Sequence, residues 1–489
     1  MSIKKELLSG VFYTAIAKYS GIVVSLVITA ILARLIAPED FGVVAIATVI
    51  IAFFNIFSDL GIAPAIVQNK TLLKEDLNHI FSFTIYFAIG ISSSFFFCSW
   101  AIASFYDSEI LVPICQLLSL NLFFATLNLV PNALLFKEKN FRFIAFRSLF
   151  IQCVGGGIAI AVALTGGGIY ALLVNPIFSA ILLFTVSFVK HPLSFRLHLK
   201  TEALRKIVGF STFQFLFNLI NYFSRNLDKL LIGKFMPMTS LGYYEKSYRL
   251  MMLPLQNITH VITPVMHPIL SESQDDLPRL ASSYERIVQI LAFLGFPLSV
   301  FLFFSAKEVT LILFGEQWMP SVPCFQILAL SVGVQVVLSS SGSIFQAAND
   351  TKRLFLSGAL SSALNVIAIL IGLLYFKTIE AVAACICSSF AINFLQAYYL
   401  LYRHTLRRPL HFFFKQLRSP LMLSALLVIV LWLLSNLCGD LSLLISLMVK
   451  GFISLLLACL YIQLSGVYNL VKRLQTMFQR KPKEESLEK

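Results

Sequence analysis

The chain has 489 residues, of which 58% are hydrophobic and only 13% are charged, and its mean hydropathy is +0.84. Soluble domains carry roughly 25% charged residues, so this composition excludes a water-soluble fold. The formal net charge is +14, but the basic residues lie in loops beside apolar segments, where they suit membrane topology and anionic headgroups. Nucleic acid is therefore excluded as a partner, and membrane lipids are expected around the protein.

Apolar segments of about 20 residues, the length of a helix that spans a bilayer, follow one another along the chain. In the first half we predict helices over residues 11–36, 41–64, 79–105, 110–135, 148–165 and 168–189. After a basic connector, residues 190–206, we predict helices over residues 207–234, 241–268, 284–305, 321–346, 353–376 and 380–402. A second basic connector, residues 403–418, precedes a final pair over residues 420–437 and 441–463.

These segments predict an all-α polytopic membrane protein with about 14 transmembrane helices. We expect two pseudo-symmetric six-helix lobes, followed by a C-terminal helix pair. The predicted boundaries are 1–206 for the N-lobe, 207–402 for the C-lobe, 403–465 for helices 13 and 14, and 466–489 for a cytoplasmic tail. No connecting loop exceeds about twenty residues, so the helix bundle itself is expected to perform the function.

The basic residues also predict the orientation in the membrane. When the loops are assigned alternately to two sides, 28 of the 38 Lys and Arg residues fall on the side of the N-terminus, 4 on the other side and 6 within the apolar segments. Basic loops are retained on the cytoplasmic side. We therefore predict a multi-pass protein of a bacterial inner membrane, with both termini in the cytoplasm.

A repeat links the two halves of the sequence. Residues 31–42 align with residues 231–242 at an offset of 200, with a cation, two apolar residues, a short turn and an apolar residue before Gly at matching places. A weaker echo relates the loops that end at Arg142 and Arg353, at an offset of 211. Six helices separate the copies, so the halves should be related by an axis along the membrane normal. The alternative is that any helical hairpin favours Gly after its turn.

Charged residues are predicted to lie deep in the first two helices of each half. They are Lys18, Asp59, Arg225, Asp228, Lys229, Glu245, Lys246 and Arg249. A charge at membrane depth is costly and usually faces a cavity, a partner or a pathway. Five cations against three acids leave a surplus of positive charge, which favours a hydrated cavity for an anion. Phosphate or pyrophosphate suits such a site, because Arg offers forked hydrogen bonds and Lys a point charge.

The alternative to a cavity role is internal pairing of these charges. Asp228 and Lys229 follow Arg225 at i+3 and i+4 on one helix face, and Arg249 follows Glu245 at i+4. Pairing is the favoured interpretation for Asp228 and Glu245. Lys450, in the predicted final helix, stands apart from the cluster and has no acid close to it in sequence.

The sequence contains no recognisable catalytic equipment. It has no His-Glu-x-x-His, no Gly-x-Ser-x-Gly and no acidic metal-binding cluster. The run Gly155-Gly156-Gly157 is not followed by Lys-Ser or Lys-Thr, so it indicates close helix packing rather than a phosphate loop. We expect neither an enzyme, nor a catalytic residue, nor a bound metal.

Three segments resemble those of a known family. They are LARLIAPEDFG at residues 32–42, FSDLG at 57–61 and NYFSRNLDKLLIGK at 221–234. Together they resemble bacterial polysaccharide flippases of the Wzx type, and most of all the colanic-acid exporter branch, within the multidrug/oligosaccharidyl-lipid/polysaccharide exporter superfamily. The first segment is fairly specific, whereas the helix count is not.

The resemblance implies that an oligosaccharide linked to undecaprenyl pyrophosphate is moved from the cytoplasmic to the periplasmic leaflet by a two-lobe bundle with alternating access. It places cavity cations at Lys18, Arg225, Lys246 and Arg249. Asp59, Asp228 and Glu245 are candidates for cavity or coupling acids. A proton, sodium or the membrane potential remains open as the driving force, and no other cofactor is expected. A polysaccharide polymerase and glycosyltransferases of the same pathway are the expected protein partners.

Three other functions compete with this one. A multidrug antiporter of the same superfamily would favour an acidic cavity for cationic drugs, and a peptidoglycan lipid-precursor flippase would use the same chemistry. Membrane glycosyltransferases and polymerases resemble one another in having a large periplasmic loop, and no predicted outer loop here is long enough. The final helix pair either offers an apolar groove to the isoprenoid tail or only stabilises the bundle. The residues expected to line such a groove are Leu426, Leu427, Val430, Leu455, Leu456 and Leu457.

Overall fold

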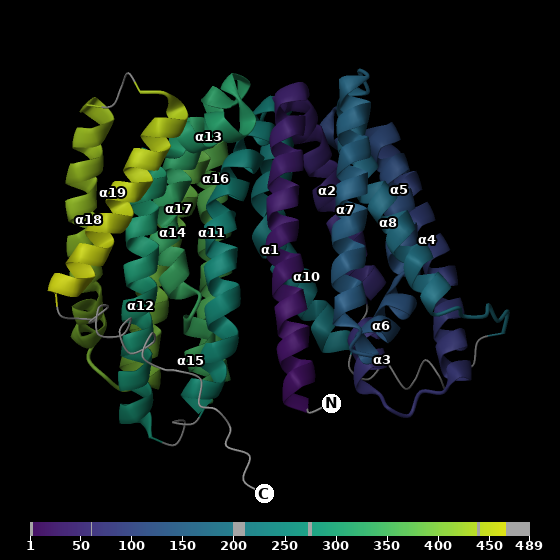
Figure 1. Ribbon diagram of the computed structural model, residues 1–489, viewed down its shortest axis with the longest axis horizontal. Coiled ribbons are helices and arrows are strands. Elements are labelled where there is room, and N and C mark those ends of the chain that lie inside the picture. Colours follow the sequence, from purple (N-terminus) through teal and green to yellow (C-terminus); the bar gives the residue numbers. More distant parts are fainter. Residues whose placement is uncertain (1–2, 60, 199–210, 272–275, 438–440, 466–489) are drawn as a thin grey trace, which may run out of the picture. The chain divides into compact units, whose positions relative to one another are not determined.

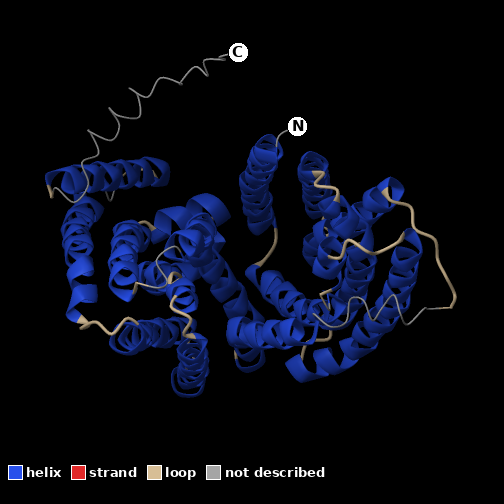
Figure 2. Cartoon of the chain, turned by 90° about the horizontal axis from the view of Figure 1, so that it is seen from below, coloured by secondary structure: helices blue, strands red, loops and turns tan. Residues whose placement is uncertain are grey.

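A computed structural model describes residues 3–59, 61–198, 211–271, 276–437 and 441–465. Every regular element in these ranges is a helix, and no strand occurs among them (Figure 2). The predicted tail at 466–489 lies outside the described residues, as does the side chain of Asp59. The prediction of an all-α fold is confirmed.

By its contacts the chain forms two compact units, which are residues 1–245 with 314–317 and residues 246–313 with 318–489. The helices that lie wholly in the first unit are α1 (Ile3–Leu35), α2 (Pro38–Asp59), α3 (Ile62–Gln68), α4 (Lys74–Tyr106), α5 (Leu111–Leu127), α6 (Leu129–Lys137), α7 (Phe141–Leu164), α8 (Ala171–Lys190) and α10 (Ser211–Phe235), with the short turn η1 (Gly168–Tyr170). The next helix, α11 (Met238–Ser271), begins in this unit.

The remaining helices belong to the second unit, apart from residues 314–317, which the contacts assign to the first unit. They are α12 (Leu277–Phe304), α13 (Ala306–Phe314), α14 (Val322–Leu338), α15 (Ser341–Ala347), α16 (Thr351–Ile371), α17 (Ile379–Tyr399), α18 (His411–Leu437) and α19 (Leu443–Leu464), with the short segments η2 (Glu316–Ser321), η3 (Gly372–Phe376) and η4 (Leu400–Thr405). In Figure 1, α18 and α19 lie side by side, and both contact α12.

Twelve stretches of the described chain are long and apolar enough to cross a membrane. The two long helices outside this set are α10 and α11, and these are the helices that carry most of the predicted deep charges. The structure therefore supports a multi-pass membrane protein, while the count of fourteen spanning helices stays a prediction. Large side chains such as Phe97 and Trp100 are exposed, as expected for helices surrounded by lipid rather than water.

One predicted helix is interrupted. Residues 41–64 were expected to form a single helix, but α2 ends at Asp59 and α3 begins at Ile62. Gly61 between them has a φ of 71°, in the left-handed region that glycine adopts without steric cost. Helix α3 then packs with α6 and the start of α4 around Ile66 and Val130.

A polar ladder fixes the connector that follows α8. Asn78, Ser82 and Tyr86 stand four residues apart on α4 and so share one face of the helix. Asn78 Oδ1 and Ser82 Oγ accept backbone N–H groups of the connector at 2.9 and 2.8 Å, and Tyr86 Oη donates to a connector carbonyl at 3.4 Å. These bonds hold residues 194–197 against α4.

One turn conformation is found in both units at the loops of the second echo, at an offset of 210 rather than the predicted 211. Lys139 and Asn349 both have a left-handed backbone, with φ of 57° and 54°. In each turn the following residue, Asn140 or Asp350, donates its N–H to a carbonyl five residues earlier, at 3.1 and 2.9 Å. A helix begins directly after each turn, at Phe141 and at Thr351. The two turns therefore have the same hydrogen bonding, as a repeat predicts.

The first echo brings its own copies into contact. The helix break after Leu35 recurs after Phe235, and the next helices begin at Pro38 and Met238, again at an offset of 200. Within the first unit, a Cβ on Gly42 would strike the carbonyl group of Met238, and a Cβ on Gly242 would strike the carbonyl group of Pro38. The contact is reciprocal, and we call it the glycine cross. It lets the first turns of α2 and α11 approach backbone to backbone, as small residues do in membrane helices.

A buried ion pair holds α19 in the second unit. Lys450 Nζ lies 2.5 Å from Glu308 Oε1 on α13, and it also donates to the carbonyl of Phe304 at 2.8 Å. Ser446 Oγ donates to the same Glu308 oxygen at 2.8 Å. Lys450 and Glu308 are both buried. Lys450, which has no acid close to it in the sequence, thus pairs with Glu308, which lies more than a hundred residues earlier.

The glycine cross yields a prediction about stability. Gly42→Ala and Gly242→Ala should each destabilise the protein by about 1–3 kcal/mol, because a methyl group against a backbone carbonyl forces the two helices apart. Thermal unfolding in detergent measures this. Gly157→Ala on α7 is the matched control, since nothing lies within 4 Å of the position its Cβ would take. An unchanged midpoint for both Gly42→Ala and Gly242→Ala would refute the close contact.

The buried pair yields a second prediction. Lys450→Ala should destabilise the protein by about 3–5 kcal/mol, because it leaves the Glu308 carboxylate buried without its cation. The double variant Lys450→Met/Glu308→Gln removes both charges. Its unfolding midpoint should lie closer to that of the wild type than the midpoint of Lys450→Ala does. Thermal midpoints of the three proteins decide the matter. A double variant less stable than Lys450→Ala would contradict the pairing.

Candidate functional site

The predicted acids on α10 and α11 already have partners in the first unit. Asp228 is buried and accepts a hydrogen bond from Tyr244 Oη at 2.6 Å. Glu245 Oε2 lies 2.6 Å from Lys229 Nζ. The pairing therefore runs between neighbouring helices, whereas the sequence pattern had suggested partners at i+3 and i+4 on the same helix. Acids held in this way lose much of the cost of leaving water.

The last turn of α10 is fastened to the end of α4. Lys234 Nζ lies 2.8 Å from Asp107 Oδ2 and 5.1 Å from the centre of the Phe105 ring. Tyr106 Oη donates to the carbonyl of Leu230 at 3.3 Å. These contacts fix α10 along its length relative to α2 and α4, which it also touches.

Two of the four predicted cavity cations are in the first unit, and both are exposed. Lys18 lies on α1 and Arg225 on α10. Among the described residues neither side chain has an acid or another polar partner. Their charge is therefore available to an anion, in contrast with Lys229, whose charge is matched by Glu245.

The other two predicted cations fall in the second unit. Lys246 is buried, with Nζ 5.7 Å from the centre of the Trp318 ring, a geometry in which the ring face attracts the ammonium. The next residue, Ser247, donates to the carbonyl of Ser321 at 2.9 Å. Arg249 is half-buried one turn further along α11. Among the described residues, no group of three or more His, Cys, Asp or Glu side chains is placed to hold a metal ion.

The final helix pair is partly used for packing. Leu427 and Leu423 are fully buried beside Phe293, and Leu457 packs against the same cluster. By contrast, Leu426 and Leu455 are exposed. The residues proposed for a groove are thus divided between a packed face against α12 and an outward face.

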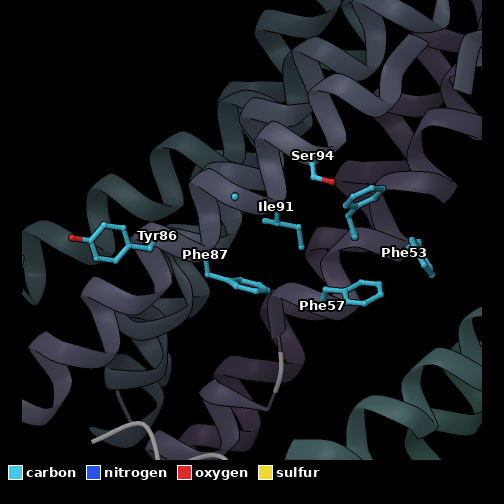
Figure 3. A pocket seen from close by; sticks show the side chains of 8 residues that line it. Phe53, Phe57, Tyr86, Phe87, Ile91 and Ser94 are labelled. Atoms are coloured by element: carbon cyan, nitrogen blue, oxygen red, sulfur yellow. The ribbon is translucent and has the colours of Figure 1, made fainter. Parts of the chain in front are cut away.

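An aromatic pocket, which the sequence analysis missed, lies between α2 and α4 (Figure 3). Its volume is about 440 Å³, within the range of small-molecule sites. The residues that line it are Phe53, Phe54 and Phe57 of α2 and Tyr86, Phe87, Gly90, Ile91 and Ser94 of α4. The Tyr86 hydroxyl is directed to the connector, so Ser94 supplies the remaining polar group. None of the lining residues is charged.

Phe53 joins this pocket to α10. Its ring centre lies 5.5 Å from that of Tyr222 and 5.8 Å from that of Phe223. Tyr222 Oη also donates to the carbonyl of Val49 on α2 at 2.8 Å. The spacing of Phe residues in α2 was visible in the sequence, but it did not distinguish a pocket wall from ordinary lipid-facing rings.

Comparison with known proteins assigns the family. The family described as "Polysaccharide biosynthesis protein" matches residues 31–323. A membrane protein of the cps region of Klebsiella pneumoniae is 26% identical over 419 residues, covering 83% of this chain and 84% of the relative. The lipopolysaccharide biosynthesis protein WzxC of Escherichia coli (strain K12) is 25% identical over 378 residues, covering 76% of each.

A solved structure supports the fold. The lipid II flippase MurJ, in an inward closed conformation, superposes with a TM-score of 0.71 at 15% identity, over 93% of this chain and 99% of that one. The resemblance to Wzx-type polysaccharide flippases is thereby confirmed at the level of family and fold. Since the family match covers more than half of the sequence, the chain belongs to the polysaccharide biosynthesis protein family.

Proposed function

We propose that this protein is a flippase that exports a lipid-linked oligosaccharide, carried on undecaprenyl pyrophosphate, from the cytoplasmic to the periplasmic leaflet for surface polysaccharide biosynthesis. The observation that carries the proposal is the exposed guanidinium of Arg225, which has no polar partner among the described residues, on a helix whose other deep charges are paired. Membership of the family and the MurJ-like fold agree with it. Alternating access of the bundle would supply the movement.

The pyrophosphate is the chemical reason for the surplus of cations. With Asp228 held by Tyr244 and Glu245 by Lys229, Lys18 and Arg225 have no acid to neutralise them among the described residues. An unpaired cation at membrane depth is expensive unless an anion or water reaches it. A pyrophosphate accepts forked hydrogen bonds from Arg and attracts Lys as a point charge.

In this proposal Lys18, Arg225, Lys246 and Arg249 bind the pyrophosphate. Asp59, Asp228 and Glu245 are the groups available for coupling to a proton or sodium ion. Of these acids, Glu245 already shares its charge with Lys229, so protonating it would release a cation and link a coupling ion to the anion site.

The partners and the location follow from the same proposal. The protein would work in a bacterial inner membrane with both termini in the cytoplasm, since the basic loops fall on that side. It would receive its substrate from glycosyltransferases and pass it to a polysaccharide polymerase. It would carry out no covalent chemistry itself.

A peptidoglycan-precursor flippase is the second candidate, because MurJ shares the fold. Its substrate would present the same pyrophosphate, so the anion site does not separate the two. A multidrug antiporter, to whose fold the chain also superposes with a TM-score of 0.59, would instead require unpaired acids. The described acids on α10 and α11 are paired, which favours an anionic cargo.

The anion site is tested by alanine variants. Arg225→Ala and Arg249→Ala should each reduce export strongly at unchanged protein level, because losing one charged partner of a contact that the substrate buries costs about 2–5 kcal/mol. Lys18→Ala and Lys246→Met should reduce it as well. Surface polysaccharide and flipped lipid-linked sugar are measured in cells. Lys352→Ala, an exposed cation at the start of α16, is the control and should export normally. Full export by Arg225→Ala and Arg249→Ala would reject the anion site.

The orientation is tested separately with reporter fusions. Fusions after residues 106, 166 and 439 should be active only as periplasmic reporters, and fusions after residues 195 and 410 only as cytoplasmic ones, because the predicted loops alternate sides. Reporter activity is normalised to the amount of fusion protein. One reproducible reversal would overturn the predicted helix count without touching the anion site.

A further inference from the structure

Helix α4 contains a glycine, Gly90, at a position where helix packing does not require one. Gly90 lies in the interior of α4, where glycine weakens a helix relative to alanine. It makes no turn, and nothing lies within 4 Å of the position that its Cβ would take. By contrast, Gly155 and Gly156 on α7 stand against Asn175 and Ile28. The absent side chain of Gly90 therefore leaves space, and that space is part of the aromatic pocket.

We propose that the aromatic pocket between α2 and α4 holds the part of the isoprenoid chain next to the pyrophosphate of the substrate. This inference rests on the proposed function and names the group that recognises the lipid. The wall of the pocket is made of five aromatic rings, one isoleucine, Gly90 and Ser94, with no charge. Such a wall fits a methyl-branched, unsaturated chain, whose methyl groups and double bonds make close contact with ring faces.

The charge next to the pocket matches the other end of such a molecule. Phe53 in the pocket wall packs on Tyr222 of α10, and Arg225 follows Tyr222 at i+3, on the same side of that helix. Arg225 is exposed and has no polar partner among the described residues. Within the first unit, an apolar pocket and an available guanidinium are thus joined by one aromatic bridge. An amphiphile with an anionic head and a branched apolar chain complements both ends.

Figure 3 shows how the walls are arranged. Phe87 and Ile91 extend from α4 toward Phe57 of α2, while the Tyr86 hydroxyl points away from them. That hydroxyl is the one that binds the connector. The centre of the pocket is therefore apolar, and a Cβ at position 90 would meet no atom within 4 Å.

The test measures binding to the purified full-length protein in lipid nanodiscs. The probes are undecaprenyl pyrophosphate and octadecyl pyrophosphate, which share the head group and differ in the chain. Wild type should bind the branched probe at least tenfold more tightly than the straight one. Gly90→Phe should lose this preference and keep its affinity for octadecyl pyrophosphate. Arg225→Ala should weaken the binding of both probes.

Gly157→Phe is the matched control. Gly157 is also an interior helix glycine with nothing within 4 Å of its Cβ position, but it lies on α7, away from the pocket lining. This variant should retain the tenfold preference. Thermal midpoints of the two Phe variants show whether each is folded, and Gly90→Leu, a smaller filling, should reduce the preference in the same direction.

The outcomes separate this inference from the proposed function. If Gly90→Phe and Gly90→Leu keep the full preference, the pocket holds ordinary membrane lipid and the inference is wrong, while the anion site stands. An equal loss in Gly157→Phe would also reject it, because the effect would not belong to the pocket. If wild type binds neither probe, the proposed function itself fails.

Discussion

The cost of placing charge in a low-dielectric bilayer governs the organisation of this protein. Among the described residues, cations and acids on neighbouring helices pair with one another at two places. Lys229 meets Glu245 between α10 and α11, and Lys450 meets Glu308 between α19 and α13. Against this background, the exposed guanidinium of Arg225 and the exposed ammonium of Lys18 are informative, because the described residues offer them no acid. An anionic cargo is the simplest partner for these two positive charges.

Close packing takes the place of the hydrophobic effect, since lipid tails are as apolar as the helices themselves. Gly156 lets α7 approach Ile28 of α1, and the glycine cross lets α2 approach α11. Gly90 is used in the opposite sense, because it creates an opening that no other side chain fills. The same residue type thus joins helices at two places and leaves open space at a third, and only tertiary contacts distinguish the cases.

What could be predicted from the sequence was local. Apolar length located nearly all the helices, and the offset of 200 between residues 31–42 and 231–242 located two helix breaks that correspond in the structure. The interruption at Gly61 was missed, because a single glycine within an apolar run does not reveal its φ angle. The lobe boundary at residue 206 stays a prediction. Helix α10, which follows that boundary in the sequence, contacts α2 and α4 of the first unit.

The site was less predictable, because pairing depends on which helices become neighbours. Spacing at i+3 and i+4 suggested partners for Asp228 and Glu245 on their own helices, whereas Tyr244 and Lys229 reach them from the adjacent one. Glu308 lies between the predicted helices 284–305 and 321–346, far from Lys450 in the sequence, so its pairing with Lys450 was not visible. The aromatic pocket depends on the empty space beside Gly90, which leaves no trace in composition or periodicity.

The glycine cross also constrains how the gene can change. Most packing contacts tolerate substitution, because a larger residue on one side can be offset by a smaller one on the other. Here each glycine faces a peptide carbonyl of the other copy, and every amino acid carries that carbonyl. No exchange at position 38 or 238 can make room for a side chain at 42 or 242. Related proteins should therefore keep both glycines without covarying partners, even where the two copies have otherwise lost their sequence similarity.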